Sequence, residues 1–211
     1  MTYKANKINR ERKKKGGYKS LIVYWLGTTI YDLTVLFCQL YIQSFRQKEQ
    51  MTQGARTGKQ GIVEGSLENS VEGNLKLTGV ARASYGELLE DFLDFLRQKG
   101  LPVWDKNDPR VVSIRQMADR PYKTYKSYRT YTTYTKTPES FANLMITLCY
   151  KQSYLLDRLL KANQEKFVRE GGFRENLFRK RREYQAKKVS SFNHSPTLAK
   201  TRDFLTTESG A

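Results

Sequence analysis

The sequence predicts an all-α protein: an up-and-down four-helix bundle with a long connector between the third and fourth helices and a C-terminal basic helix. Three observations support this class. Apolar residues recur with helical spacing in long segments, four glycines share one helix face, and helix-capping residues mark segment boundaries. A chain of 211 residues can build one core with extensions. We expect the bundle in residues 18–170, with its connector at 101–137.

The most apolar segment, residues 21–45, is predicted to be the first helix. Its core face has helical spacing and comprises Ile22, Leu26, Ile30, Leu33, Phe37 and Leu40. A polar stripe that includes Asp32 argues against a membrane anchor, because a mid-span Asp costs about 3 kcal/mol there. Cys38 and Cys149 lie in apolar contexts and are too few for a disulfide framework. We expect no membrane segment and a cytoplasmic location.

Residues 51–65 carry four glycines at i, i+4, i+7 and i+11, namely Gly54, Gly58, Gly61 and Gly65. This spacing places them on one face of a short helix, where they would admit a neighbouring helix unusually closely, with Gly65 just past the end. A flexible glycine-rich loop is the alternative interpretation. A phosphate-binding loop does not fit, because three residues separate Gly54 from Gly58 and Gln60 replaces the Ser or Thr that would hold magnesium.

A polar run at residues 66–74 is predicted to reverse the chain before a third helix at residues 75–99. The Gly100-Leu101-Pro102 sequence ends that helix. Its apolar face is predicted to comprise Ala81, Tyr85, Leu88, Leu89, Phe92, Leu93, Phe95 and Leu96.

The connector contains a short predicted helix and a tyrosine repeat. Asp108-Pro109 is a favourable helix start, which predicts a helix over residues 110–118. Tyrosines then recur at every third position, interleaved with basic residues: Tyr122, Tyr125, Tyr128, Tyr131 and Tyr134, with Lys123, Lys126 and Arg129. A polyproline-like extended chain would align these rings, so we expect an extended segment. The rings would either fasten it to the bundle or stack on single-stranded bases.

The fourth helix is predicted to begin at Thr137-Pro138-Glu139 as cap, first-turn proline and first-turn acid. It continues to about Glu170, with a core face of Phe141, Leu144, Met145, Leu148, Leu155, Leu159 and Leu160. Two glycines at 171–172 then precede a basic helix over residues 173–187. We expect disorder in the basic arm, residues 1–17, and in the polar tail, residues 189–211.

The formal charge of +17 is concentrated outside the predicted core. Residues 1–20 carry +7 and residues 171–188 carry +5, whereas residues 21–100 carry −1. Such a distribution is typical of proteins that bind nucleic acid, although it would also arise from solubilising charge on mobile ends. The candidate nucleic-acid-binding residues are Arg10, Arg12, Lys13, Lys14, Lys15, Arg56, Lys59, Lys123, Lys126, Arg129, Arg179, Lys180, Arg181 and Arg182.

Enzymatic chemistry has little support in the sequence, and we expect no catalytic residues, cofactor or metal site. The only histidine, His194, lies in the polar tail. Glu87, Asp91 and Asp94 share a helix face that could hold a divalent cation, but such a row is more often a solvated face. We interpret Glu64, near Arg56 and Lys59 on preceding turns, as a structural residue that forms an ion pair within the bundle or across a subunit boundary.

Three segments together resemble a known family: YKSLIVYW at residues 18–25, GIVEG at residues 61–65 and ARASYGELLE at residues 81–90. They are similar to the four-helix-bundle proteins encoded in ribosomal-RNA intervening sequences, a family that includes the accessory variability protein of diversity-generating retroelements. The long connector and the basic ending resemble its suffix-bearing branch. The resemblance implies a homopentameric barrel with a basic surface and, in retroelement members, partnership with a reverse transcriptase and its RNA.

From these features we expect a non-enzymatic, homo-oligomeric protein that binds RNA or DNA through charge, as an accessory to a reverse transcriptase or a mobile-element ribonucleoprotein. The alternative is a ring-shaped scaffold that binds another protein and has no nucleic-acid function.

Overall fold

The computed structural model describes residues 17–119 and 124–193, in which every regular element is a helix. The all-α prediction is therefore confirmed. Two short 3₁₀ helices, Tyr18–Ser20 and Ser127–Thr135, accompany six α-helices: α1 (Ile22–Tyr41), α2 (Phe45–Leu67), α3 (Val71–Lys99), α4 (Pro109–Asp119), α5 (Pro138–Glu170) and α6 (Phe173–Asn193).

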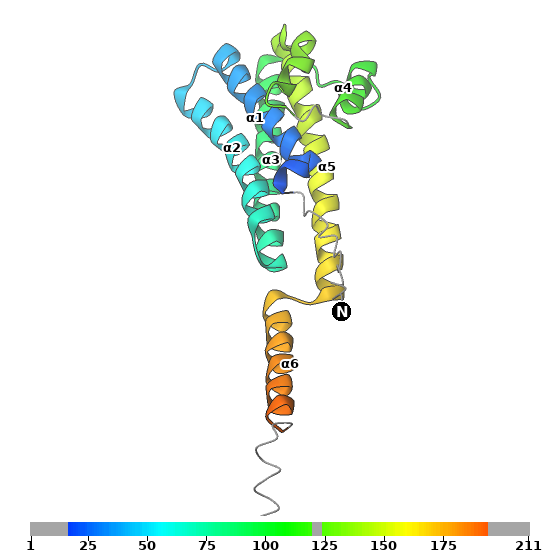
Figure 1. The fold of residues 1–211 in the computed structure, drawn as a ribbon. Helices are drawn as coiled ribbons and strands as arrows, with labels where there is room; N and C mark the ends of the chain where they lie inside the picture. The colour runs from blue at the N-terminus through cyan, green and yellow to red at the C-terminus, as the bar shows by residue number, and fades with distance from the viewer. Residues whose placement is uncertain (1–16, 120–123, 194–211) are drawn as a thin grey trace, which may run out of the picture.

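Four long helices alternate in direction along the chain: α1 and α3 run one way, α2 and α5 the other (Figure 1). Helix α2 packs on α3, α3 on α5, and α1 on both α2 and α5. Helix α4 lies outside this group, against α5. Helix α6 extends beyond the end of α5, away from the other helices (Figure 1). None of the described helices combines the length and the apolar character that a membrane span requires.

Phe37 of α1 lies at the centre of the core. Its ring meets those of Phe92, Phe95 and Phe141 edge-on, with centroids 4.9–5.3 Å apart. These contacts join α1 to α3 and α5, in the geometry that aromatic quadrupoles favour. The predicted first-helix core face is confirmed at its centre but wrong at its ends, where Ile22 and Leu40 are 42% and 55% exposed because they lie on terminal turns.

The predicted boundary between the first two helices is wrong. Helix α1 ends at Tyr41 rather than at residue 45, and Ser44 caps a new helix by accepting a hydrogen bond from the backbone N–H of Gln47 at 3.3 Å. Helix α2 is consequently longer than residues 51–65. Gly65 lies inside it, not past its end.

The turn before α3 is also shorter than predicted. Ser70 accepts a hydrogen bond from the N–H of Gly73 at 2.9 Å, so α3 begins at Val71 and only residues 68–70 separate α2 from α3. The predicted end is confirmed: Gly100 follows Lys99 with φ 64°, a left-handed conformation that glycine adopts without steric cost.

Tyr128, Tyr131 and Tyr134 of the tyrosine repeat lie in a 3₁₀ helix at Ser127–Thr135, not in an extended chain; Tyr125 lies in the turn before it, and Tyr122 is outside the described residues. A 3₁₀ helix also has three residues per turn, so the period of three is satisfied without extension. Tyr131 is buried and Tyr134 meets Trp104 edge-on at 6.4 Å. These two rings fasten the segment to the core, as one of the two predicted roles required.

The remainder of the connector is held by Asn143 on α5. Its side-chain oxygen accepts a hydrogen bond from the buried backbone N–H of Trp104 at 2.8 Å, and its amide donates to the carbonyl of Pro102 at 2.9 Å. The Arg110 guanidinium stacks 3.6 Å from the Trp104 ring centroid. The helices predicted from Pro109 and Pro138 are both present, and Thr137 accepts a hydrogen bond from Ser140 N–H as the predicted cap.

Candidate nucleic-acid interface

Helix α6 exposes side chains around its whole circumference. Arg179, Lys180, Arg181 and Arg182 are all exposed, as are the aromatic rings of Phe178 and Tyr184, which are 64% and 70% accessible. A tertiary face would leave one stripe buried, and residues 173–190 have none. The predicted basic helix is thus present and available to a ligand on every side.

The junction before α6 is well defined. Gly171 has φ 75°, a conformation that favours glycine. Glu175 accepts a hydrogen bond from the N–H of Gly172 at 3.0 Å, and the Asn176 side-chain amide donates to the carbonyl of Glu170 at 3.0 Å. These bonds satisfy backbone groups at the break between the helices and so fix the direction in which α6 leaves α5.

The other predicted basic residues do not form one cluster with α6. Arg56 is exposed on α2, whereas Lys59 is half-buried, and Lys126 and Arg129 are exposed on the tyrosine segment. Glu64 is exposed and makes no ion pair within the described residues, so the predicted pairing inside the bundle is wrong, and pairing across a subunit boundary stays a prediction. The remaining predicted residues lie outside the described ranges: Arg10, Arg12, Lys13, Lys14, Lys15 and Lys123.

Lys59 contributes to a pocket of about 540 Å³ between α1, α2 and the tyrosine segment. Its ammonium lies 4.3 Å from the centroid of the Tyr31 ring. Asp32, about half-buried in the same pocket, accepts no hydrogen bond within the described residues. Burial raises the pKa of its carboxyl, and the charge of Lys59 opposes that shift.

Tyr125 closes one side of this pocket, with its ring 56% exposed. The ring lies 5.4 Å from that of Trp25, whose indole N–H donates to the carbonyl of Lys19 at 2.7 Å. Burial, with the neighbouring Tyr125, raises the pKa of Tyr24 to about 12. A hydrogen bond of 3.5 Å between the two hydroxyls, with weaker effects from nearby lysines, lowers the pKa of Tyr125. Either hydroxyl can be the donor in this pair.

Three of the four glycines in α2 allow close approach to α3. A Cβ on Gly61 would lie 2.9 Å from the backbone oxygen of Leu77, and one on Gly58 would lie 2.8 Å from the ring of the fully buried Tyr85. A Cβ on Gly65 would lie 3.3 Å from the backbone oxygen of Asn74. Gly54 has nothing within 4 Å, so its predicted packing role is wrong.

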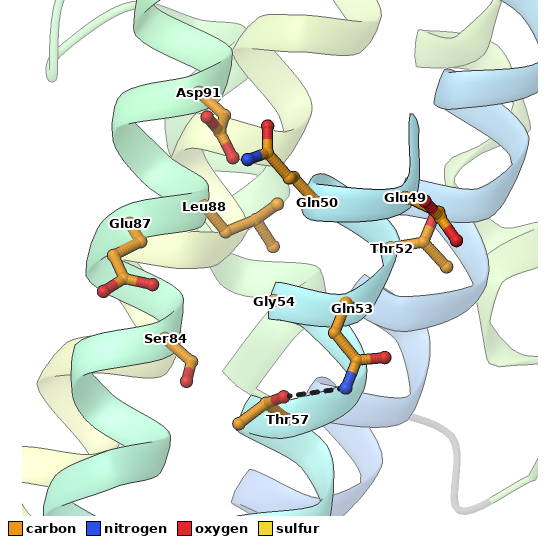
Figure 2. A pocket seen from close by; sticks show the side chains of 10 residues that line it. All are labelled: Glu49, Gln50, Thr52, Gln53, Gly54, Thr57, Ser84, Glu87, Leu88 and Asp91. Atoms are coloured by element: carbon orange, nitrogen blue, oxygen red, sulfur yellow. Dashed lines mark hydrogen bonds between the residues drawn. The ribbon is translucent and has the colours of Figure 1, made fainter. Parts of the chain in front are cut away.

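Near Gly54, α2 and α3 bound a polar groove of about 820 Å³. Glu87 and Asp91 lie on its α3 wall, and the Gln50 side chain points from α2 toward Asp91 (Figure 2). Burial, together with Asp94 and Glu87, raises the pKa of the Asp91 carboxyl. The residues lining this groove include no lysine or arginine, so it is an acidic surface that repels a polyanion.

The residues considered for catalysis or metal binding are placed only in part. His194 lies outside the described residues. Within the described ranges, no three histidine, cysteine, aspartate or glutamate side chains gather where they could hold a metal ion, and the row at Glu87, Asp91 and Asp94 does not form such a group. Cys38 and Cys149 are buried free thiols, and burial raises the pKa of both.

The sequence prediction missed Asp32 and Trp25 as neighbours of Lys59 and Tyr125. In the sequence, Asp32 stands out only as a polar interruption of an apolar helix. That polar residue in an apolar helix is the one sequence signal for a site. Nothing in the spacing predicts that residue 32 lies beside residue 125. Comparison of the chain with family models, with curated proteins and with solved structures gave no match.

Proposed function

We propose that this protein binds RNA or DNA through charge, without enzymatic activity, and that α6 is its principal contact. The supporting observation is a helix with net charge +5 in residues 171–188 and no buried face. A helix gains most of its stability in a protein from packing one face, and α6 has no such face. A bound polyanion would stabilise α6 by neutralising the basic side chains of the helix, which repel one another.

The proposal also includes the bundle topology and the assembly of the protein. We interpret α1, α2, α3 and α5 as an up-and-down four-helix bundle, as the family resemblance implies. On that basis the protein assembles as a homopentamer with a reverse transcriptase and its RNA, or with another mobile-element ribonucleoprotein, as partner, and acts in the cytoplasm. A monomer mass by light scattering at micromolar concentration would contradict this assembly.

The test of nucleic-acid binding is its salt dependence. If eight phosphates of a single strand are neutralised, log affinity should fall against log salt with a slope of about −6. Replacing Arg179, Lys180, Arg181 and Arg182 by glutamine should weaken binding and make the slope shallower by about 0.7 for each phosphate that is no longer neutralised. Four consecutive positions surround the helix, so about two of the side chains can reach one strand, and a slope change of about 1.4 is expected.

A matched control removes four exposed positive charges that lie outside α6. In this variant glutamine replaces Arg46, Lys76, Lys99 and Lys106. Both quadruple variants have the same net charge, so a general charge effect would weaken them equally. A loss confined to the α6 variant supports the proposal. Undetectable binding of the wild-type protein at low salt would refute it and favour a protein-interaction scaffold whose charges only solubilise it.

A further inference from the structure

We propose that the pocket lined by Asp32, Lys59 and Tyr125 binds one unpaired base of a single-stranded nucleic acid. The base stacks on Tyr125, and its exocyclic amino group donates a hydrogen bond to Asp32. This inference rests on the proposed nucleic-acid function. It assigns base contacts to a site separate from α6.

The carboxylate determines which part of a nucleic acid fits this pocket. A phosphate would meet the negative charge of Asp32, which is half-buried and accepts no hydrogen bond within the described residues. An amino group on a base edge carries no negative charge and donates hydrogen bonds, so it can bind to the Asp32 carboxylate. Carboxylates accept hydrogen bonds from cytosine N4 in known recognition geometries, whereas uracil presents a carbonyl at that position. The pocket therefore favours a base that carries an amino group, with cytosine as the reference case.

The aromatic wall is preorganised for stacking. The Tyr125 ring rests on Trp25, its hydroxyl lies 3.5 Å from that of Tyr24, and over half of its surface remains open. Trp25 is itself fixed by its bond to the carbonyl of Lys19. A ring held in place loses little conformational freedom when a ligand binds. Unpaired bases are commonly recognised by such rings together with hydrogen bonds to their edges.

One basic residue lines the pocket, and two more follow its tyrosines directly in the sequence. Lys59 lines it, and Lys126 and Arg129 are exposed on the segment that carries Tyr125. The cavity volume of about 540 Å³ is within the range of small-ligand sites, about 300–1,000 Å³. Single-strand sites usually combine stacking rings with cations that follow the backbone.

The experiment compares three labelled oligonucleotides of equal length by fluorescence anisotropy: oligocytidine, oligouridine and an abasic strand with the same phosphates. Wild-type protein should bind oligocytidine most tightly and the abasic strand most weakly. Tyr125→Ala should weaken oligocytidine binding by between about fivefold and about 150-fold, the range for one stacked base, and leave abasic binding unchanged. Tyr125→Phe keeps the ring and should bind like wild type, which separates stacking from the Tyr24 hydrogen bond.

Asp32→Asn tests the base edge. The introduced amide can donate to the uracil carbonyl, so the preference for oligocytidine over oligouridine should disappear. Abasic binding should strengthen slightly, because the substitution removes one negative charge. Tyr154→Ala is the matched control, because Tyr154 is 54% exposed and has Lys151 and Arg158 beside its ring, yet lies on α5 outside this pocket. Circular dichroism should confirm that each variant retains its helices.

The outcomes separate the two proposals. If the α6 glutamine variant loses affinity for all three strands while Tyr125→Ala changes none of them, the pocket assignment is wrong and the proposed function remains. Equal losses in Tyr125→Ala and Tyr154→Ala would also overturn the assignment. If wild-type protein binds none of the strands at low salt, both proposals fail.

Discussion

Replacing Gly61 by leucine should destabilise the protein, because Gly61 of α2 faces the backbone of α3 with no room for a side chain. A Cβ there would lie 2.9 Å from the backbone oxygen of Leu77 and 3.1 Å from the Cβ of Ala81. A backbone oxygen inside α3 cannot rotate away as a side chain could, so the two helices must separate. Overpacking of this kind costs about 1–3 kcal/mol, and leucine carries three carbons beyond that Cβ.

Gly54→Leu provides the matched control, since it makes the same substitution in the same helix where nothing lies within 4 Å. Leucine is a better helix former than glycine by about 0.8 kcal/mol, so this variant should be as stable as wild type or slightly more so. Urea unfolding followed by circular dichroism measures both free energies. In a thermal scan the Gly61 variant should lose about 2–4 °C per kcal/mol. Equal unfolding midpoints for the two variants would refute the packing role of Gly61.

Two further substitutions test the groove and the connector. Asp91→Asn should stabilise the protein at neutral pH. Burial raises the pKa of Asp91 in the folded state above its ordinary value of 3.8, so the folded state binds the proton more tightly than the unfolded state does. The stability of the wild-type protein therefore falls as pH rises from 3.8 through the raised pKa. The difference should vanish in unfolding measurements below pH 3.8, the ordinary value; a constant difference would contradict this cause. Asn143→Ala should cost about 1–3 kcal/mol in urea unfolding, because the buried N–H of Trp104 loses its acceptor. An unchanged midpoint would show that the connector is held elsewhere.

Helix identity was predictable wherever apolar periodicity and a cap agreed. Thr137 and Pro138 placed the start of α5 correctly, and Gly100 placed the end of α3. The break after Tyr41 was missed because apolar residues continue to Phe45, and the capping role of Ser44 depends on the backbone turning there. A cap residue inside an apolar run gives a weak signal, since serine also occurs within helices.

The candidate site was less predictable because its parts come from distant segments. The basic composition of α6 follows from the sequence alone, but its exposure on every side depends on how the junction at Gly171 directs it away from the core. The period of the tyrosines fits two conformations with three residues per turn, and only packing of Tyr131 into the core selects the 3₁₀ helix.

The acidic groove between α2 and α3 affects how a polyanion approaches the protein. From Gly58 to Gly65 the helices are in close contact. On the N-terminal side of Gly58, residues 49–57 of α2 instead border a groove that carries Glu87 and Asp91 and has no lysine or arginine among its lining residues. That face repels phosphate, whereas α6 is a separate element and the pocket at Tyr125, which shares only α2 with the groove, has Lys59 among its lining residues. The uneven charge would therefore orient an approaching strand before it binds, more strongly at low salt, where charges act over longer distances. Placing positive charge in the groove, as in Glu87→Lys, should increase binding to the abasic strand without changing the preference for cytosine.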